Sequence, residues 1–163
     1  MAEKEQLKVS DEWNKVNQWL DEYEKHIGLN LKPNDKVEEL LNLNYDQLNS
    51  LSNRDLSISS YLLAQYSTWL QKEYNRHSAK RKWCYHCFDV MIGKFGRNMG
   101  GQFTPYDERK LILGVENSFC EALSRLIKET TSILETLSFM SKKIESMAFL
   151  LRDISRIKED PND

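Results

Sequence analysis

One heptad pattern constrains this chain more than any other feature. Between residues 133 and 154, apolar side chains recur at alternating steps of four and three residues without interruption. Such spacing places them along one side of an α-helix and is typical of a helix that packs lengthwise against other helices. We call these residues the seam: Ile133, Leu137, Met140, Ile144, Met147, Leu151 and Ile154. The final part of the chain is therefore predicted to be one long helix.

Glycine and proline, which interrupt helices, gather mainly in residues 27–35 and 93–105. The chain is therefore predicted to be all-α. Two long helices, at about residues 53–95 and 105–158, are joined by a Gly-rich loop and preceded by one or two shorter N-terminal helices. Ser52 or Asn53 is a suitable N-cap for the first long helix. A chain of 163 residues is expected to form one folding unit.

Helices of this length, roughly 60 to 80 Å at about 1.5 Å per residue, would leave apolar surface uncovered in a simple hairpin. Apolar residues beside the seam widen the apolar stripe, which favours several helices packing together. We therefore expect a homo-oligomeric helical bundle formed through the C-terminal helix. The alternative is a monomeric three-helix bundle in which the same residues form an ordinary core.

Charge is distributed unevenly along the chain, although the formal net charge is only -2. Residues 1–50 hold six Lys and eleven acidic residues, a net charge of -5. Residues 69–97 hold seven Lys or Arg and two acidic residues, a net charge of +5. This asymmetry suggests an anionic partner for the middle of the chain and a solvating or partner-binding role for its acidic front.

Within the basic segment, cations and aromatic rings share one helix face. Trp69, Lys72, Arg76, Lys80 and Trp83 follow one another at steps of three, four, four and three. Single-stranded nucleic acid requires cations that follow the phosphates and aromatic faces on which bases stack. In the alternative interpretation, the cations form a solvated face and the two tryptophans belong to the core. The candidate nucleic-acid-binding residues are Lys72, Arg76, Lys80, Arg81, Lys82, Trp83, Tyr85, Lys94 and Arg97.

Lys94 and Arg97 belong to the segment "GKFGRNMGGQF", residues 93–103. Its glycines leave backbone amides exposed, so the segment could approach phosphates closely. It lacks the spacing of a P-loop. A phosphate-contacting hairpin and a plain interhelical linker are both compatible with this composition.

Other functional classes find little support in the sequence. Cys84, His86 and Cys87 could suggest zinc, but a structural site needs four ligands, usually as two pairs, and only Cys120 remains. No histidine lies in a recognisable nucleophile motif. We predict no metal, no cofactor and no catalytic activity. Without a signal peptide or a run of about 18 apolar residues, we expect no membrane association and a cytoplasmic location, in the host cytoplasm if the protein is viral.

Four segments resemble the phage recombination mediator family of UvsY type, and the resemblance covers about residues 60–152. They are "YSTWLQKE" (66–73), "AKRKW" (79–83), "FGRNMGGQF" (95–103) and "LIKETTSILETLSFMSKKIESMAF" (126–149). Members of that family are small helical proteins that form ring-like oligomers through their C-terminal helices. They bind single-stranded DNA without sequence preference and help a RecA-like recombinase to replace a single-strand-binding protein. The resemblance implies phosphate contacts by Lys80 and Lys82, next to the aromatic pair Trp83 and Tyr85.

The resulting hypothesis is a non-enzymatic recombination mediator that binds single-stranded DNA. Its implied partners are a RecA-like recombinase, a single-strand-binding protein and further copies of itself. Residues 1–50 would be an acidic helical N-terminal extension, a candidate contact for either protein partner, and residues 51–160 the helical core for DNA binding and oligomerisation. The alternative is a structural or regulatory helical phage protein whose basic face docks on an acidic protein.

Overall fold

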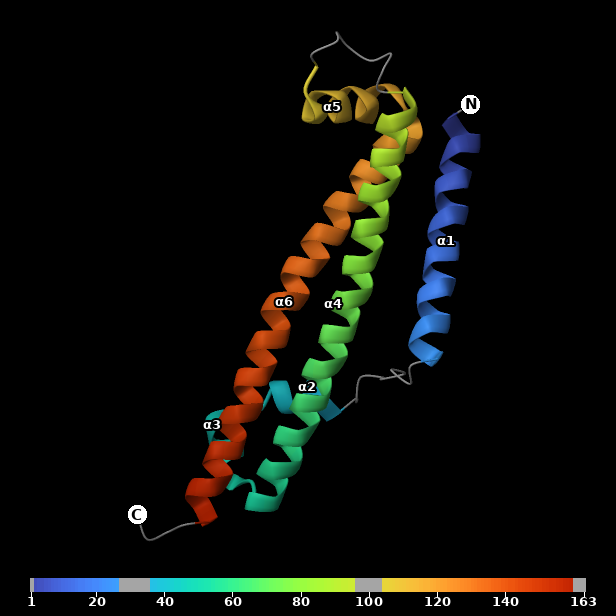
Figure 1. Ribbon diagram of the computed structural model, residues 1–163. Helices are drawn as coiled ribbons and strands as arrows, with labels where there is room; N and C mark the ends of the chain where they lie inside the picture. The colour runs from blue at the N-terminus through green and yellow to red at the C-terminus, as the bar shows by residue number, and fades with distance from the viewer. Residues whose placement is uncertain (1, 27–35, 96–103, 160–163) are drawn as a thin grey trace. The chain divides into compact units, whose positions relative to one another are not determined.

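The computed structural model describes residues 2–26, 36–95 and 104–159, and every regular element within them is an α-helix (Figure 1). The all-α class predicted from the sequence is confirmed. Among the described residues, three helices precede the long middle helix, where one or two were expected. The helices are α1 (Ala2–His26), α2 (Lys36–Leu41), α3 (Tyr45–Ser50), α4 (Asn53–Phe95), α5 (Tyr106–Glu116) and α6 (Ser118–Glu159).

Helix α4 begins directly after the predicted cap. The Ser52 hydroxyl accepts a hydrogen bond from the Asp55 backbone N–H at 3.1 Å and donates one to the Asp55 carboxylate at 2.6 Å. The hydroxyl therefore satisfies one of the backbone donors that a helix start leaves without a partner. The helix then continues for 43 residues, because no glycine or proline occurs before Gly93.

The second long helix predicted from the sequence is interrupted. Helix α5 ends at Glu116, Asn117 has an extended backbone with φ -124° and ψ 116°, and α6 begins at Ser118. The Asn117 side-chain oxygen accepts a hydrogen bond from the Cys120 backbone N–H at 3.1 Å. Asparagine is a preferred N-cap. The apolar spacing continues across this residue, so hydrophobic periodicity alone could not reveal the break.

The helices form two compact units. The first comprises residues 1–29 and 75–134, and the second comprises residues 30–74 and 135–163. We call the first the α1 unit, because it contains all of α1. We call the second the α2–α3 unit, because it contains all of α2 and α3. Helices α4 and α6 each contribute to both. This grouping differs from the division at residue 50 expected from the charge, because it assigns α1 to one unit and α2 and α3 to the other.

The core of the α2–α3 unit lies between α4 and α6. Leu56, Leu63 and Leu70 of α4 are separated by steps of seven and pack in one cluster with Ile144 and Leu151 of α6. Hydroxyl groups line the same contact. Ser57 and Ser155 lie 3.0 Å apart, Ser60 donates to the Ala148 carbonyl at 2.8 Å, and Ser67 donates to the Ser141 carbonyl at 3.2 Å. The two helices therefore approach closely enough for side chains of one to bond the backbone of the other.

The seam is used within the chain. Six of its seven residues pack in the core cluster of the α2–α3 unit: Leu137, Met140, Ile144, Met147, Leu151 and Ile154. Ile133 lies outside this cluster and is exposed. Helix α4 offers its own leucines at heptad spacing, so it supplies the complementary surface that was expected from a second copy. Self-association through the seam stays a prediction.

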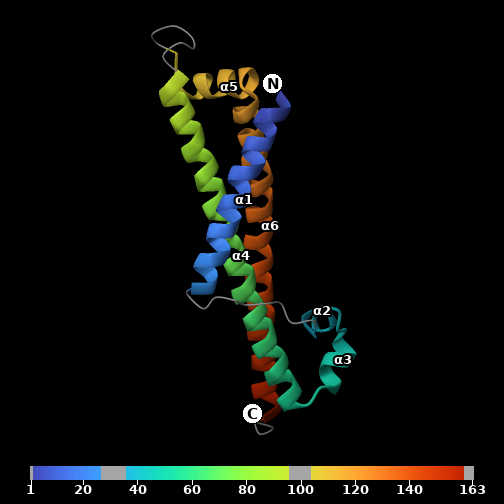
Figure 2. The same ribbon diagram turned by 90° about the vertical axis from the view of Figure 1, so that its right-hand side faces the viewer.

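The α1 unit has a separate core. Cys84 and Phe88 of α4 pack with Leu113 of α5 and with Cys120 and Leu123 of α6, and all five side chains are buried. Helix α1 lies alongside α4 and α6 in this unit, and α5 runs crosswise to them (Figures 1 and 2). No described helix is both long and apolar enough to cross a membrane.

Candidate nucleic-acid interface

Helix α1 covers the part of the predicted basic stripe that lies in its unit. The Arg76 guanidinium contacts the Asp21 carboxylate at 2.6 Å and the Glu24 carboxylate at 3.2 Å, and it also donates to the Asn17 carbonyl at 3.4 Å. Only 16% of the Arg76 side chain is exposed. Charge-assisted bonds of this kind are among the stronger polar contacts in proteins. Arg76, which was predicted to contact nucleic acid, therefore has an anionic partner within the chain.

Lys80 is still less accessible, with 8% of the residue exposed. Its ammonium group lies 5.3 Å from the centroid of the Trp13 ring, a cation–π contact. The Trp13 ring in turn packs against Trp83 with the centroids 6.0 Å apart and the planes tilted by 53°. Steps of three and four place side chains on one helix face, but here that face is covered by α1. Lys80 and Trp83, which were predicted to contact nucleic acid, thus lie under α1.

The other end of the stripe lies in the α2–α3 unit. Trp69 stacks on Tyr66, with ring centroids 5.3 Å apart, and packs against the core of that unit. The core interpretation considered for this tryptophan is confirmed. Lys72 is largely covered and lies 3.7 Å from the Glu73 carboxylate.

Three of the predicted residues form a different surface. Arg81, Lys82 and Tyr85 follow the covered positions on α4, and Lys82 and Tyr85 are exposed. Among the described residues, neither Arg81 nor Lys82 forms an ion pair. Helix α5 adds Lys110, whose ammonium group lies 4.7 Å from the centroid of the Tyr85 ring. We call Arg81, Lys82, Tyr85 and Lys110 the outer basic surface.

Helix α5 is held beside this surface by a polar contact. The Tyr106 hydroxyl donates a hydrogen bond to the Asp89 carboxylate. This bond, together with partial burial, raises the pKa of Tyr106 to about 12. Because Asp89 accepts this bond, α4 and α5 are joined one turn beyond Tyr85, which keeps Lys110 close to the ring.

Lys94 does not extend the outer basic surface. Lys94 is exposed in the last turn of α4. It follows Tyr85 by nine residues, which corresponds to about half a turn around the helix, so the two side chains leave from opposite sides. Arg97 and the glycines of residues 96–103 lie outside the described residues.

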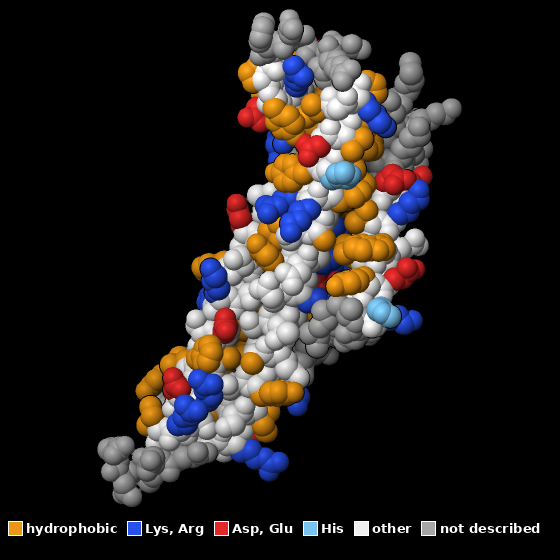
Figure 3. Space-filling view, viewed as in Figure 1, with side chains coloured by type: hydrophobic (Ala, Val, Ile, Leu, Met, Phe, Trp, Pro, Cys, Tyr) orange, Lys and Arg blue, Asp and Glu red, His pale blue; other side chains and the backbone are white. Residues whose placement is uncertain are grey.

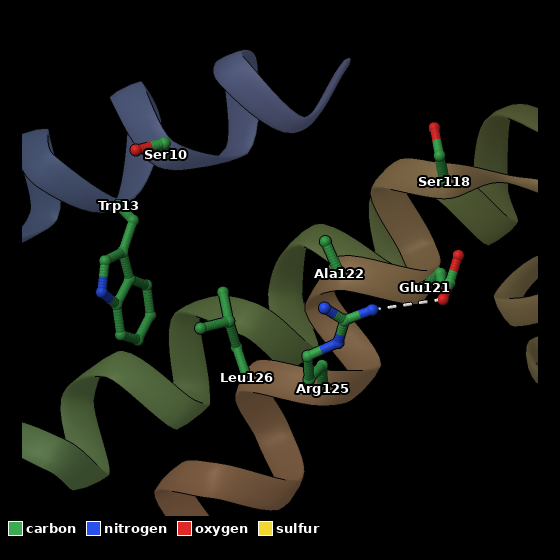
Figure 4. A pocket seen from close by; sticks show the side chains of 7 residues that line it. All are labelled: Ser10, Trp13, Ser118, Glu121, Ala122, Arg125 and Leu126. Carbon is green, nitrogen blue, oxygen red and sulfur yellow. Dashed lines mark hydrogen bonds and ion pairs between the residues drawn. The ribbon is translucent and has the colours of Figure 1, made fainter. Parts of the chain in front are cut away.

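Described residues of α1 line two cavities. The larger, with a volume of about 340 Å³, lies between α1 and α6. Figure 4 shows Trp13 of α1 beside it, facing Leu126, Ala122 and the Arg125–Glu121 ion pair of α6. The other, of about 280 Å³, lies between α1 and α4 and is lined by Trp19, Leu20, Ala79 and Trp83 among others. Hydrophobic side chains gather where α1 lies against α4 (Figure 3).

Sequence reasoning missed the residues that α1 and α5 bring to α4, which are Trp13, Asp21, Glu24 and Lys110. A signal for the carboxylates was present, since the charges of residues 1–50 and 69–97 are equal and opposite. Glu24 also follows Leu20 by four residues, so it shares the face that α1 buries. No comparable pattern indicates Lys110, which depends on how α5 packs.

Among the described residues, no three His, Cys, Asp or Glu side chains are grouped so that they could hold a metal ion. The chain matches no protein-family model, no curated protein and no solved structure.

Proposed function

We propose that the protein is a non-enzymatic recombination mediator that binds single-stranded DNA. The observation that carries this proposal is the outer basic surface. Tyr85 is 39% exposed, Lys110 lies over its ring, and Arg81 and Lys82 precede it by about one helical turn. An accessible ring among cations offers both interactions that a single strand uses, base stacking and phosphate attraction.

The family resemblance of residues 66–73, 79–83, 95–103 and 126–149 supports the more specific part of the proposal. By that resemblance, the partners are a RecA-like recombinase and a single-strand-binding protein, and the DNA-bound form is a homo-oligomer. Tyr85 provides a stacking surface that accepts any base, which agrees with binding without sequence preference.

Titration of short fluorescent oligonucleotides tests DNA binding. Replacing both Arg81 and Lys82 with Ala should weaken binding and reduce the slope of log K against log salt by about 1.4, since each phosphate contact on a single strand contributes about 0.7. Tyr85→Ala should weaken binding by about 1–3 kcal/mol through lost stacking, with little change in slope.

The matched control is the pair Lys142→Ala and Lys143→Ala, because these are also adjacent cations on a long helix, and both are exposed. This control should retain the slope of the parent. An equal effect of both double variants would show that only net charge matters. If the parent protein ignores oligonucleotides but binds an acidic protein through Arg81 and Lys82, the alternative of a structural or regulatory helical protein replaces the mediator.

A further inference from the structure

Helix α1 presents to α4 the same two kinds of group that single-stranded DNA would present. Its carboxylates Asp21 and Glu24 contact the Arg76 guanidinium. Its Trp13 ring lies against Lys80 and Trp83. A phosphate could replace a carboxylate at a guanidinium, and a base could replace an indole beside Trp83.

The contact between α1 and the rest of its unit is limited. Among the side chains described on α1, those of residues 10–26, only Leu20 is buried. Trp19 and Tyr23 stack on each other with centroids 5.8 Å apart and remain exposed. The two cavities beside α1 further reduce its packing. Elements with few buried apolar contacts are those that open locally at low free-energy cost.

We infer that α1 is an autoinhibitory helix, which occupies a second single-stranded-DNA-binding face of α4 and is displaced by the strand. The face consists of Arg76, Lys80 and Trp83, and it adjoins Lys82 of the outer basic surface along the same helix. This inference rests on the proposed DNA-binding function. When α1 lies on α4, which we call the closed form, the strand reaches only the outer basic surface. Displacement of α1 also exposes Arg76, Lys80 and Trp83 to the strand. The apparent affinity is then reduced by the fraction of molecules in which α1 is closed.

The test removes the carboxylates that hold Arg76 and keeps their shape. The variant D21N/E24Q should bind a single-stranded oligonucleotide about tenfold more tightly than the parent, because closure loses its charge-assisted bonds. The matched control D11N/E22Q also converts one Asp and one Glu of α1. Both control residues are exposed, and among the described residues neither side chain forms a hydrogen bond or an ion pair with α4. The control should stay within about twofold of the parent.

Hydrogen exchange provides a second measurement. Adding oligonucleotide to the parent should accelerate amide exchange in residues 10–26, while α4 and α6 stay protected. In D21N/E24Q without DNA, α1 should already exchange faster, and protection of α4 and α6 will show that the variant is folded.

The outcomes separate the two proposals. If the parent binds DNA through the outer basic surface but D21N/E24Q binds no more tightly than D11N/E22Q, the autoinhibitory role of α1 is wrong and the proposed function stands. Slower exchange of α1 on adding DNA would also overturn it, because α1 would then be stabilised rather than displaced. If neither the parent nor either variant binds oligonucleotides, the DNA-binding function itself fails.

Discussion

At the residue scale, Cys84 and Cys120 retain their protons more strongly than ordinary thiols. Both side chains are fully buried in the apolar core of the α1 unit. Burial raises the pKa of Cys84 to about 12 and that of Cys120 to about 11, from an ordinary value of 9.0. In the unfolded chain both thiols would ionise near the ordinary value. The unfolded state therefore loses protons first as the pH rises, and it gains stability relative to the folded state.

We predict that the free energy of unfolding decreases above the ordinary thiol pKa of 9.0, by about 1.4 kcal/mol per pH unit for each buried thiol until its folded pKa is reached. Urea unfolding followed by circular dichroism at a series of pH values measures this slope. Cys120→Ala serves as the comparison. It should remove the contribution of one thiol to the slope of the unfolding free energy against pH, even if it also changes the unfolding free energy at every pH. A free energy of unfolding that does not change across this pH range would contradict the prediction. Labelling of Cys84 and Cys120 in the native protein at the rate seen in urea would also contradict it.

The residues of the candidate site show what spacing can and cannot predict. Steps of three and four correctly place Arg76, Lys80 and Trp83 on one face of α4. Whether that face meets solvent depends on α1, which is distant in sequence and contacts it only in the folded chain. Helical periodicity describes one helix at a time, so it predicts the face but not what covers it.

At the element scale, the break between α5 and α6 depends on one residue. Asn117 leaves the helical conformation and caps α6 through its side chain. This allows Tyr106 and Lys110 of α5 to reach α4. A single capping residue inside an amphipathic pattern is a weak signal, which is why the sequence predicted one uninterrupted helix.

Asn117→Ala should reduce the free energy of unfolding by about 1 kcal/mol, because the Cys120 amide loses its acceptor. Asn117→Asp is the control, since aspartate caps helices about as well as asparagine and should be close to neutral. Urea unfolding measures both. Equal stability of the Ala and Asp variants would mean that the side chain at this position does not determine where α6 begins.

For the seam, in contrast, the sequence contained both the apolar pattern and the pattern of its packing partner. Its spacing was visible in the sequence, and the residues do pack along one side of α6. The partner was also visible, because Leu56, Leu63 and Leu70 repeat at steps of seven on α4. A heptad pattern indicates that a helix packs lengthwise, but it does not distinguish a partner in the same chain from one in another copy.

At the scale of the whole molecule, the two oppositely charged segments meet within the chain. The acidic residues Asp21 and Glu24 come from the first segment, and Arg76 comes from the second. A charge asymmetry along a sequence therefore does not by itself require an external polyanion, since oppositely charged residues can form ion pairs within the fold. Among the cations of the second segment outside this pairing, Arg81 and Lys82 are the ones on which the DNA-binding proposal depends.

Two substitutions on α6 distinguish packing of the seam within one chain from assembly of several copies through it. Ile144 is 4% exposed within the core of the α2–α3 unit. Ile144→Asp would bury a charge without a partner and should cost more than about 4 kcal/mol, so helicity should fall together with stability. Phe139 lies on the same helix and is 69% exposed, so Phe139→Asp should leave helicity unchanged. Circular dichroism and light scattering on both variants distinguish the two arrangements. If Ile144→Asp instead keeps its helicity and only loses mass relative to the parent, then the seam joins copies of the chain, and α4 is not the partner that holds it in solution.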